Sequence, residues 1–209
     1  LLENPCLIGE HNGQNAAAAY AAVKTAGVAP HAIMACIQSY PGLVHRQEPV
    51  SLVDDVAFVN DSKATNADAA ARAVASYDTV YWIAGGRSKE DGLEAVKNYL
   101  GNIRHAYLIG DAAMKFSQQL DGYVPFTLAD DLETAVNQAF EAAKADTSNR
   151  PVVLLSPACA SFDQFKNFEE RGNMFKDLVE ALPGKHIDPF EKPGQFSAGV
   201  EPHGPEDMK

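Results

Sequence analysis

Apolar and polar positions change their spacing near residue 49, from a helical period to short runs that alternate with helices. Before that point we expect two helices, an alanine-rich one over residues 12–26 and another over residues 30–39 opened by its proline. After it, we expect strands at residues 50–53, 56–59, 79–84, 105–109, 124–128 and 152–156, and helices near 66–76, 92–101, 111–120, 130–145 and 165–181. This order predicts an α/β fold with a Rossmann-like, doubly wound, mostly parallel sheet.

The same pattern divides the chain into three parts. Residues 1–41 form an N-terminal helical remnant, residues 42–182 form the α/β domain, and Tyr40-Pro41-Gly42 is the candidate linker between them. Residues 183–209 hold five prolines and four glycines in 27 positions. We expect this tail to contribute little to the core after about Gly184, because that composition suits neither helix nor central strand.

Composition and charge exclude several classes of function. With 209 residues, of which 46% are hydrophobic, the chain has material for one ordinary core. A formal net charge of -11 argues against nucleic acids and anionic membranes as partners. No apolar stretch reaches the ~20 residues of a membrane helix, and the first residues lack a signal-peptide layout. Three widely spaced cysteines without a metal-ligand pattern fit a reducing compartment, so we expect a cytoplasmic protein without a metal site.

Three of the predicted strands end in polar loops. These loops are NDSKATN (60–66), GGRSKEDG (85–92) and SPACASFDQFKNFEERG (156–172). If the strands are parallel, the loops share one edge of the sheet, where ligands bind in open α/β folds. Together they supply Arg87, Lys63, Lys89 and the hydroxyls of Ser62, Thr65, Ser88 and Ser161. Such a set suits a small ligand with more than one anionic group.

Each of these residues also has an ordinary structural interpretation. A single loop lysine is usually only solvated, and Thr65 or Ser161 alone is more often a helix cap. The chain has no GxxxxGK[ST] loop, GxGxxG turn, GxSxG elbow or HExxH motif. Cys159 has no histidine assigned near it and is better interpreted as a small buried residue than as a nucleophile.

Five motifs in order make the sequence similar to one family. They are HNGQNAAAA (11–19), YPGLVHRQE (40–48), VNDSKATN (59–66), GGRSKEDG (85–92) and LLSPACASFDQFKNFEERG (154–172). Together they resemble the Mur ligases of peptidoglycan synthesis over most of residues 9–182. Sister branches carry a different run at the place of NDSKATN, and this difference points to the branch that adds D-glutamate.

The resemblance implies a three-domain enzyme of which this chain is the end of the central ATPase domain and the whole C-terminal domain. The cofactors of the full-length enzyme are then ATP and Mg, and the P-loop, the Mg-binding residues and a carbamylated lysine lie upstream. ATP phosphorylates the carboxylate of UDP-MurNAc-L-alanine, and the amine of D-glutamate attacks the acyl phosphate. The chain alone is then not expected to be active, and its partners are these substrates and the two missing domains.

The resemblance also implies roles for particular residues. Nucleotide binding falls to Asn15 at the adenine, Arg46 near ribose or phosphates, and Asp61 at the ribose hydroxyls, while Lys63 is the catalytic residue that faces the phosphates. Thr65 and Lys89 take the α-carboxylate of D-glutamate, and Ser161 with backbone groups of Phe162 and Phe168 takes its side-chain carboxylate. Phe162 stands where the family more often has leucine, which affects the shape of the pocket.

Two other interpretations stay open at this point. The chain could be a stand-alone α/β module that binds an acidic amino acid or a nucleotide without catalysis. It could also be part of a ligase that adds glutamate elsewhere, as folylpolyglutamate synthase does, although the SPACASFDQFKNFEERG block argues against this.

Overall fold

A seven-stranded sheet forms the centre of the protein, and its strand order is β5-β4-β3-β6-β2-β1-β7. The structure is a computed structural model that describes residues 4–88, 92–147 and 150–196. Its strands are β1 Glu48–Val53, β2 Val56–Asn60, β3 Val80–Gly85, β4 Ile103–Ile109, β5 Phe126–Leu128, β6 Val152–Leu155 and β7 His186–Ile187. The pairs β2·β6, β6·β3, β3·β4 and β4·β5 are parallel, whereas β1·β2 and β1·β7 are antiparallel. The mostly parallel sheet predicted from the sequence is confirmed.

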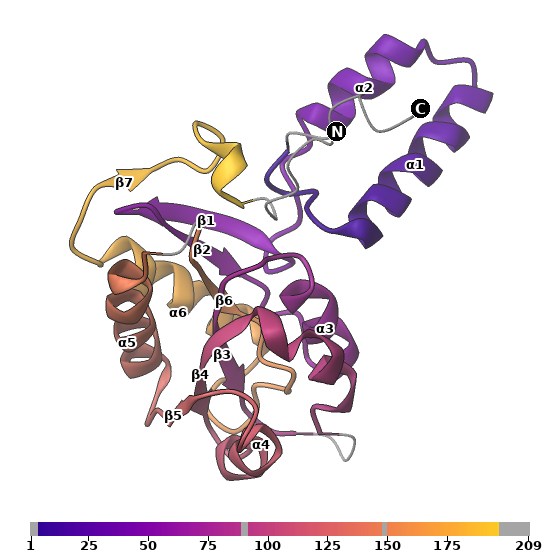
Figure 1. Cartoon of the computed structure of the whole chain (residues 1–209). Coiled ribbons are helices and arrows are strands. Elements are labelled where there is room, and N and C mark those ends of the chain that lie inside the picture. The colour runs from indigo at the N-terminus through magenta and orange to yellow at the C-terminus, as the bar shows by residue number, and fades with distance from the viewer. Residues whose placement is uncertain (1–3, 89–91, 148–149, 197–209) are drawn as a thin grey trace, which may run out of the picture.

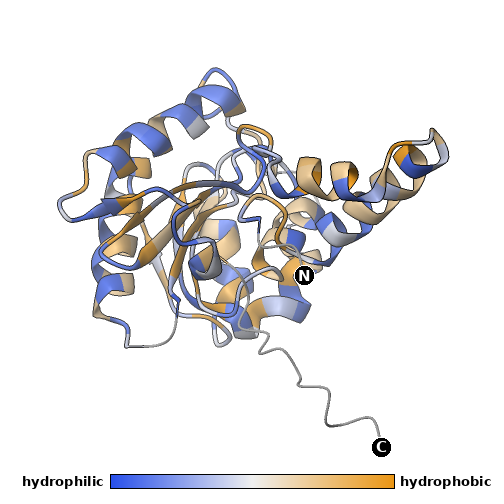
Figure 2. Cartoon of the chain, turned by 90° about the horizontal axis from the view of Figure 1, so that it is seen from above, coloured by the Kyte–Doolittle hydropathy of each residue, from blue (hydrophilic) through white to orange (hydrophobic). Residues whose placement is uncertain are grey.

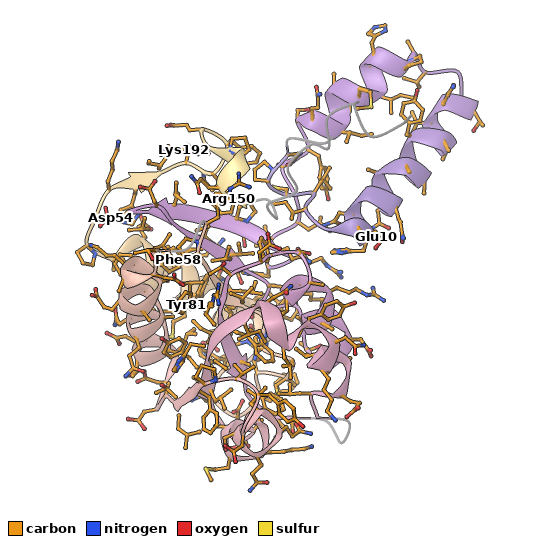
Figure 3. All side chains as sticks on the ribbon, in the orientation of Figure 1. Glu10, Asp54, Phe58, Tyr81, Arg150 and Lys192 are labelled. Atoms are coloured by element: carbon orange, nitrogen blue, oxygen red, sulfur yellow. The ribbon has the colours of Figure 1, made fainter. Side chains whose placement is uncertain are left out.

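Helices cover both faces of this sheet, as the doubly wound prediction requires (Figure 1). The helices are α1 Glu10–Thr25, α2 Pro30–Gln38, α3 Ala67–Val74, η1 Glu94–Asn102, α4 Ala113–Leu120, α5 Leu132–Ala145, α6 Phe168–Glu180 and η2 Pro193–Phe196. Apolar residues of α3, η1 and α4 pack on one face, and those of α5 and α6 pack on the other. On the second face, the ring of Phe58 lies 5.8 Å from that of Phe140 and 6.4 Å from that of Phe175 (Figure 3).

Two helices differ from the prediction. The segment expected as a helix near residues 92–101 is a 3-10 helix, η1, whose residues Asn98, Tyr99 and Gly101 have low α-helix propensity. The helix expected to begin at residue 165 begins at Phe168, because the side chain of Asn167 caps it by accepting from the Glu170 amide. The turn at Asp54 and Asp55 is the hairpin turn that the pattern indicated, with φ of 47° and 66°.

The tail prediction was wrong for residues 185–196, which form a strap across the antiparallel edge of the sheet (Figure 1). Strand β7 pairs with β1, and the 3-10 helix η2 brings the fully buried ring of Phe196 into the core on the α3 face. The β1–β2 turn holds the strap. Asp54 accepts a hydrogen bond from the Lys185 amide at 2.9 Å, and Asp55 pairs with Lys192 at 3.3 Å (Figure 3).

Helices α1 and α2 form a hairpin that stands apart from the α/β body (Figure 1). Helix α1 has no buried residue, although both helices are rich in apolar residues (Figure 2). The preceding segment belongs to this hairpin, because the Asn4 amide donates to the carbonyls of Ile37, Gln38 and Tyr40. Among the described residues, no helix is both long and apolar enough to cross a membrane.

Candidate functional site

The three polar loops meet at one edge of the sheet. Strand β6 lies between β2 and β3 and is parallel to both, so that Leu155 is in register with Asn60 on one side and with Ile83 on the other. The carboxyl ends of β2, β3 and β6 therefore release their loops side by side. This arrangement confirms the shared edge expected from the sequence.

Gly86 allows the loops after β3 and β6 to approach closely. Gly86 has φ of 122°, and a Cβ atom there would collide with the carbonyl oxygen of Ala160. The next residue completes the contact, since the Arg87 amide donates to Ala160 O at 2.8 Å and the Ala160 amide donates back to Arg87 O at 3.2 Å. Gly85 has a different role, since a Cβ atom there would collide with the carbonyl oxygen of Ile109 at the end of β4. The Arg87 side chain remains exposed.

Arg171, on the first turn of α6, ties two of the loops together. Its side chain is 1% exposed and donates from Nε to Ser62 Oγ at 3.0 Å and from Nη2 to the carbonyls of Ser62 and Cys159 at 2.9 and 3.1 Å. Ser62 Oγ in turn donates to Phe168 O at 2.8 Å. Burial lowers the pKa of the Arg171 guanidinium to about 10, so it stays charged at neutral pH. Ser62 is thus a buried structural residue, and its hydroxyl is not one of the ligand-binding hydroxyls that we expected.

Asp61 lies at the end of β2 with its carboxylate buried. Oδ2 accepts from Ser156 Oγ at 2.7 Å, and Oδ1 accepts from the Gln47 amide at 3.1 Å. Burial raises the pKa of Asp61 to about 7, against these two hydrogen bonds and the charge of Arg46, which act to lower it. A carboxylate has about four acceptor sites, so two remain for hydroxyl groups of a ligand.

A cavity of about 690 Å³ lies between the α1–α2 hairpin and this edge of the sheet. One part is lined by apolar residues of the two helices, and the other is polar. The polar lining consists of His11, Asn12, Asn15, Arg46, Gln47, Asp61, Lys63 and Arg72. All four residues predicted for nucleotide binding and catalysis, Asn15, Arg46, Asp61 and Lys63, therefore line one cavity of a size typical for small-molecule sites.

Lys63 lies against an aromatic ring at the edge of this cavity. Its ammonium group is 3.9 Å from the centroid of the Phe168 ring, a cation–π distance. The His45 ring stands edge-on to the same ring at 5.9 Å, and the His45 carbonyl accepts from the Lys63 amide at 3.0 Å. Side chain and backbone of Lys63 are thus both held by neighbouring loops.

The residues predicted for the amino acid lie on the same loops in different environments. Asn66 caps α3 by accepting from the Ala69 amide, so Thr65, which is half-buried, is not the cap. Ser161 is buried, and it is not the cap of α6 either, since Asn167 has that role. The Phe162 side chain is 65% exposed. Lys89 lies outside the described residues.

Sequence reasoning missed four residues that shape this site: His11, Gln47, Ser156 and Arg171. Gln47 and Ser156 hold the Asp61 carboxylate, and Arg171 holds the loops. An available signal was that Ser156 directly follows a buried strand, at the same edge as Asp61. The sequence contains no comparable signal for the burial of Arg171, because the helix around it has an ordinary pattern.

Acidic and sulfur-containing side chains near this site have the following arrangement. The described residues contain no group of three or more His, Cys, Asp or Glu side chains able to hold a metal ion. Cys159 is fully buried, and burial raises the pKa of its thiol to about 12, so it is not a reactive nucleophile. The interpretation of Cys159 as a small buried residue is confirmed.

Residues 45–159 match the family described as Mur ligase, glutamate ligase domain. The chain belongs to this family, and the matched segment runs from the loop before β1 to the loop after β6. It contains the Asp61 and Lys63 end of the cavity. The resemblance drawn from the five motifs is confirmed at the level of the family.

Individual relatives are similar over most of the chain. It is 52% identical over 188 residues to the UDP-N-acetylmuramoylalanine--D-glutamate ligase of Rhodospirillum rubrum, covering 90% of the chain and 39% of that protein. The ligase of the same name from Rhizobium johnstonii is 53% identical over 178 residues, which are 85% of the chain and 38% of that protein. The chain thus spans about two fifths of the length of the curated relatives it matches.

A solved structure supports the fold. The crystal structure of a UDP-N-acetylmuramate-alanine ligase from Thermotoga maritima matches with a TM-score of 0.54 at 13% identity, covering 83% of this chain and 38% of that one. At this identity the likeness concerns the fold alone.

Proposed function

We propose that this chain is the C-terminal part of an ATP-dependent ligase that joins D-glutamate to UDP-MurNAc-L-alanine in the cytoplasm, for peptidoglycan synthesis. In this proposal residues 1–41 are the end of the central ATPase domain and residues 42–182 are the amino-acid-binding domain. The observation that carries the proposal is the convergence of Asn15, Arg46, Asp61 and Lys63 on one cavity. The names of the relatives, which are about half identical to this chain, support the choice of D-glutamate.

The polar end of the cavity fits a nucleotide. Asp61 keeps free acceptor sites beside its two internal hydrogen bonds, as ribose hydroxyls require. Asn15 lies across the cavity on α1, where its amide can both donate to and accept from an adenine edge. Arg46 and Lys63 provide positive charge for phosphates. ATP, bound with Mg in the full-length enzyme, supplies the phosphoryl group that activates the substrate carboxylate.

The role of this chain is to position the incoming amino acid. Thr65 and Lys89 take the α-carboxylate of D-glutamate, and Ser161 with backbone groups of Phe162 and Phe168 takes the side-chain carboxylate. The N-terminus of α6 adds a favourable dipole for that second carboxylate. Because Arg171 ties the Ser62 loop to the Cys159 loop, it fixes the spacing of the two carboxylate sites. Positioning of this kind contributes up to ~7–11 kcal/mol to catalysis in well-arranged cases.

Substitution of Lys89 tests this assignment in the full-length enzyme. Lys89→Ala should raise the KM for D-glutamate ~10-fold or more, because a hydrogen bond to a charged group contributes about 1.5–3 kcal/mol. The KM for ATP should stay within a few-fold, and Ser161→Ala should act in the same direction but less. Steady-state kinetics with each substrate varied in turn gives both constants.

Arg87→Ala is the matched control. It removes a cation two residues from Lys89, and the side chain of Arg87 is exposed. It should leave both constants nearly unchanged. If Arg87→Ala is the more damaging change, or if Lys89→Ala shifts both constants equally, the amino-acid site is placed wrongly.

A further inference from the structure

The α1–α2 hairpin is joined to the body of the protein by very few directional contacts. Among hydrogen bonds between described residues, only the one from Gln47 to His11 links residues 4–42 with residues 43–196. The two atoms, Gln47 Nε2 and His11 Nε2, are 3.2 Å apart. The segment before α1 also touches the body by packing. Ile8 packs against the core on the α3 face, and Gly9 lies so close to Ser76 that a Cβ atom there would meet the Ser76 hydroxyl. Neither contact is a hydrogen bond, so both are less directional than the one between Gln47 and His11.

On the body side, Gln47 is rigidly anchored. Its backbone amide donates to Asp61 Oδ1, and its side chain is 9% exposed. Gln47 and His45 both have left-handed backbone conformations, with φ of 42° and 63°. Residues other than glycine adopt this strained backbone conformation only when contacts with neighbouring residues hold them in it. The His45 amide donates to Glu48 Oε2 at 2.9 Å and its carbonyl accepts from Lys63, which supplies that constraint.

On the hairpin side, His11 lies in the first turn of α1, at the end nearest the body, next to Glu10 (Figure 3). Burial, with the charge of Arg72, lowers the pKa of His11, so the ring is neutral at neutral pH. A neutral ring protonated on Nδ1 presents Nε2 as an acceptor for the Gln47 amide. His11 lies one helical turn before Asn15, so a contact at His11 also fixes the position of Asn15.

We propose that the Gln47–His11 hydrogen bond is a latch that sets the angle of the α1–α2 hairpin against the α/β body and thereby the width of the cavity between Asn15 and Asp61. Gln47 is then a positioning residue that holds Asp61 with its backbone and α1 with its side chain. Its Oε1 atom is buried without a partner among the described residues, so the amide gains its side-chain bond only from His11. The latch itself does not depend on the proposed function, whereas its effect on nucleotide binding does.

Pulsed electron paramagnetic resonance can measure the angle of the hairpin directly in the 209-residue chain. Spin labels are attached to Thr25→Cys at the far end of α1 and to Glu141→Cys on α5, two exposed positions, in a Cys36→Ser background that removes the exposed native thiol. With Gln47 and His11 both present, the distribution of distances between the labels should be narrow. Gln47→Ala should widen it at least about two-fold, because the remaining packing contacts of Ile8 and Gly9 include no hydrogen bond to the body.

Three further variants make the result specific. His11→Ala removes the same bond from the exposed helix and should widen the distribution as much as Gln47→Ala, and the double variant should add nothing. Gln38→Ala, an exposed glutamine on the same hairpin, should leave the distribution narrow. A distribution that stays narrow in both Gln47→Ala and His11→Ala overturns the latch and leaves the proposed function untouched.

The full-length enzyme then tests the consequence for nucleotide binding. Gln47→Ala should raise the KM for ATP about five-fold, the effect of one lost hydrogen bond, and should keep the KM for D-glutamate within about two-fold. A widened distance distribution together with an unchanged KM for ATP would overturn the link between the latch and the nucleotide.

Discussion

Replacing Phe196 with alanine is expected to lower the melting temperature of the chain by about 10 °C. The side chain is 0% exposed and belongs to the core on the α3 face, together with Leu52 and Ala57. Phenylalanine-to-alanine changes in a core cost ~3–5 kcal/mol, and in a domain of this size each kcal/mol lowers the melting temperature by ~2–4 °C. Thermal unfolding followed by circular dichroism measures the shift.

Phe190→Ala is the control within the same strap. Its side chain is 51% exposed, so its removal should shift the melting temperature by less than ~2 °C. If neither variant shifts the melting temperature, residues after Gly184 do not stabilise the fold, as the composition of the tail first indicated. An equally large decrease for Phe190→Ala would contradict the assignment of the stabilisation to the buried ring of Phe196.

The strap shows where sequence reasoning fails for physical reasons. Prolines and glycines exclude a long helix or a central strand, but they permit a two-residue strand such as β7 and a short 3-10 helix such as η2. Burial of Phe196 depends on the space left open beside β1, which is a property of the assembled sheet. No local pattern around Phe196 carries that information.

The sheet itself was predictable because the apolar runs, the turn residues and the alternation of strands with helices all indicated the same fold. Apolar runs such as residues 80–84 and 152–155 became parallel strands with every residue buried. The acidic pair Asp54-Asp55 became a turn between antiparallel strands. Once the strands are parallel, the shared edge of the polar loops follows from geometry. The sheet edge that carries the candidate site therefore followed from the sequence, whereas the ligands proposed for it come from the resemblance.

The internal connections of the site were not predictable in the same way. Gln47 and His11 are 36 positions apart, and Arg171 and Ser62 are 109 apart. Whether two such side chains meet depends on the angle between elements, which neither periodicity nor propensity specifies. A buried arginine is also rare, so its ordinary place on a helix gives no reason to expect the role that Arg171 has in joining the loops.

Replacing Asp61 with asparagine is expected to stabilise the protein above neutral pH while weakening its binding of nucleotide. The buried carboxyl has its pKa raised from 3.8 to about 7, so the unfolded chain releases this proton more readily than the folded one. Below about pH 4 both states hold the proton and burial of the neutral group carries no charge penalty. Stability is lost as the pH rises from about 4 to 7, and above that the whole penalty of burying the carboxylate is present.

Each pKa unit corresponds to ~1.4 kcal/mol, so this penalty has an upper bound of ~4 kcal/mol. Asparagine avoids it and keeps both hydrogen bonds, because its oxygen accepts from the Gln47 amide and its amide donates to the Ser156 hydroxyl. At pH 8 the melting temperature of Asp61→Asn should therefore exceed that of the unsubstituted chain by up to roughly 10 °C. The difference should shrink towards pH 4. Melting curves between pH 4 and pH 8 measure it.

Asp68→Asn is the control, since it removes an exposed acidic group in the first turn of the adjacent helix α3 and should shift the melting temperature little at either pH. In the full-length enzyme Asp61→Asn should raise the KM for ATP, because an amide is a poorer acceptor for two ribose hydroxyls than a carboxylate. Together these results would mean that Asp61 is kept charged against the stability of the fold in order to bind a ligand. If Asp61→Asn is instead the less stable protein at pH 8, the carboxylate stabilises the loops and the argument for a nucleotide role loses its energetic basis.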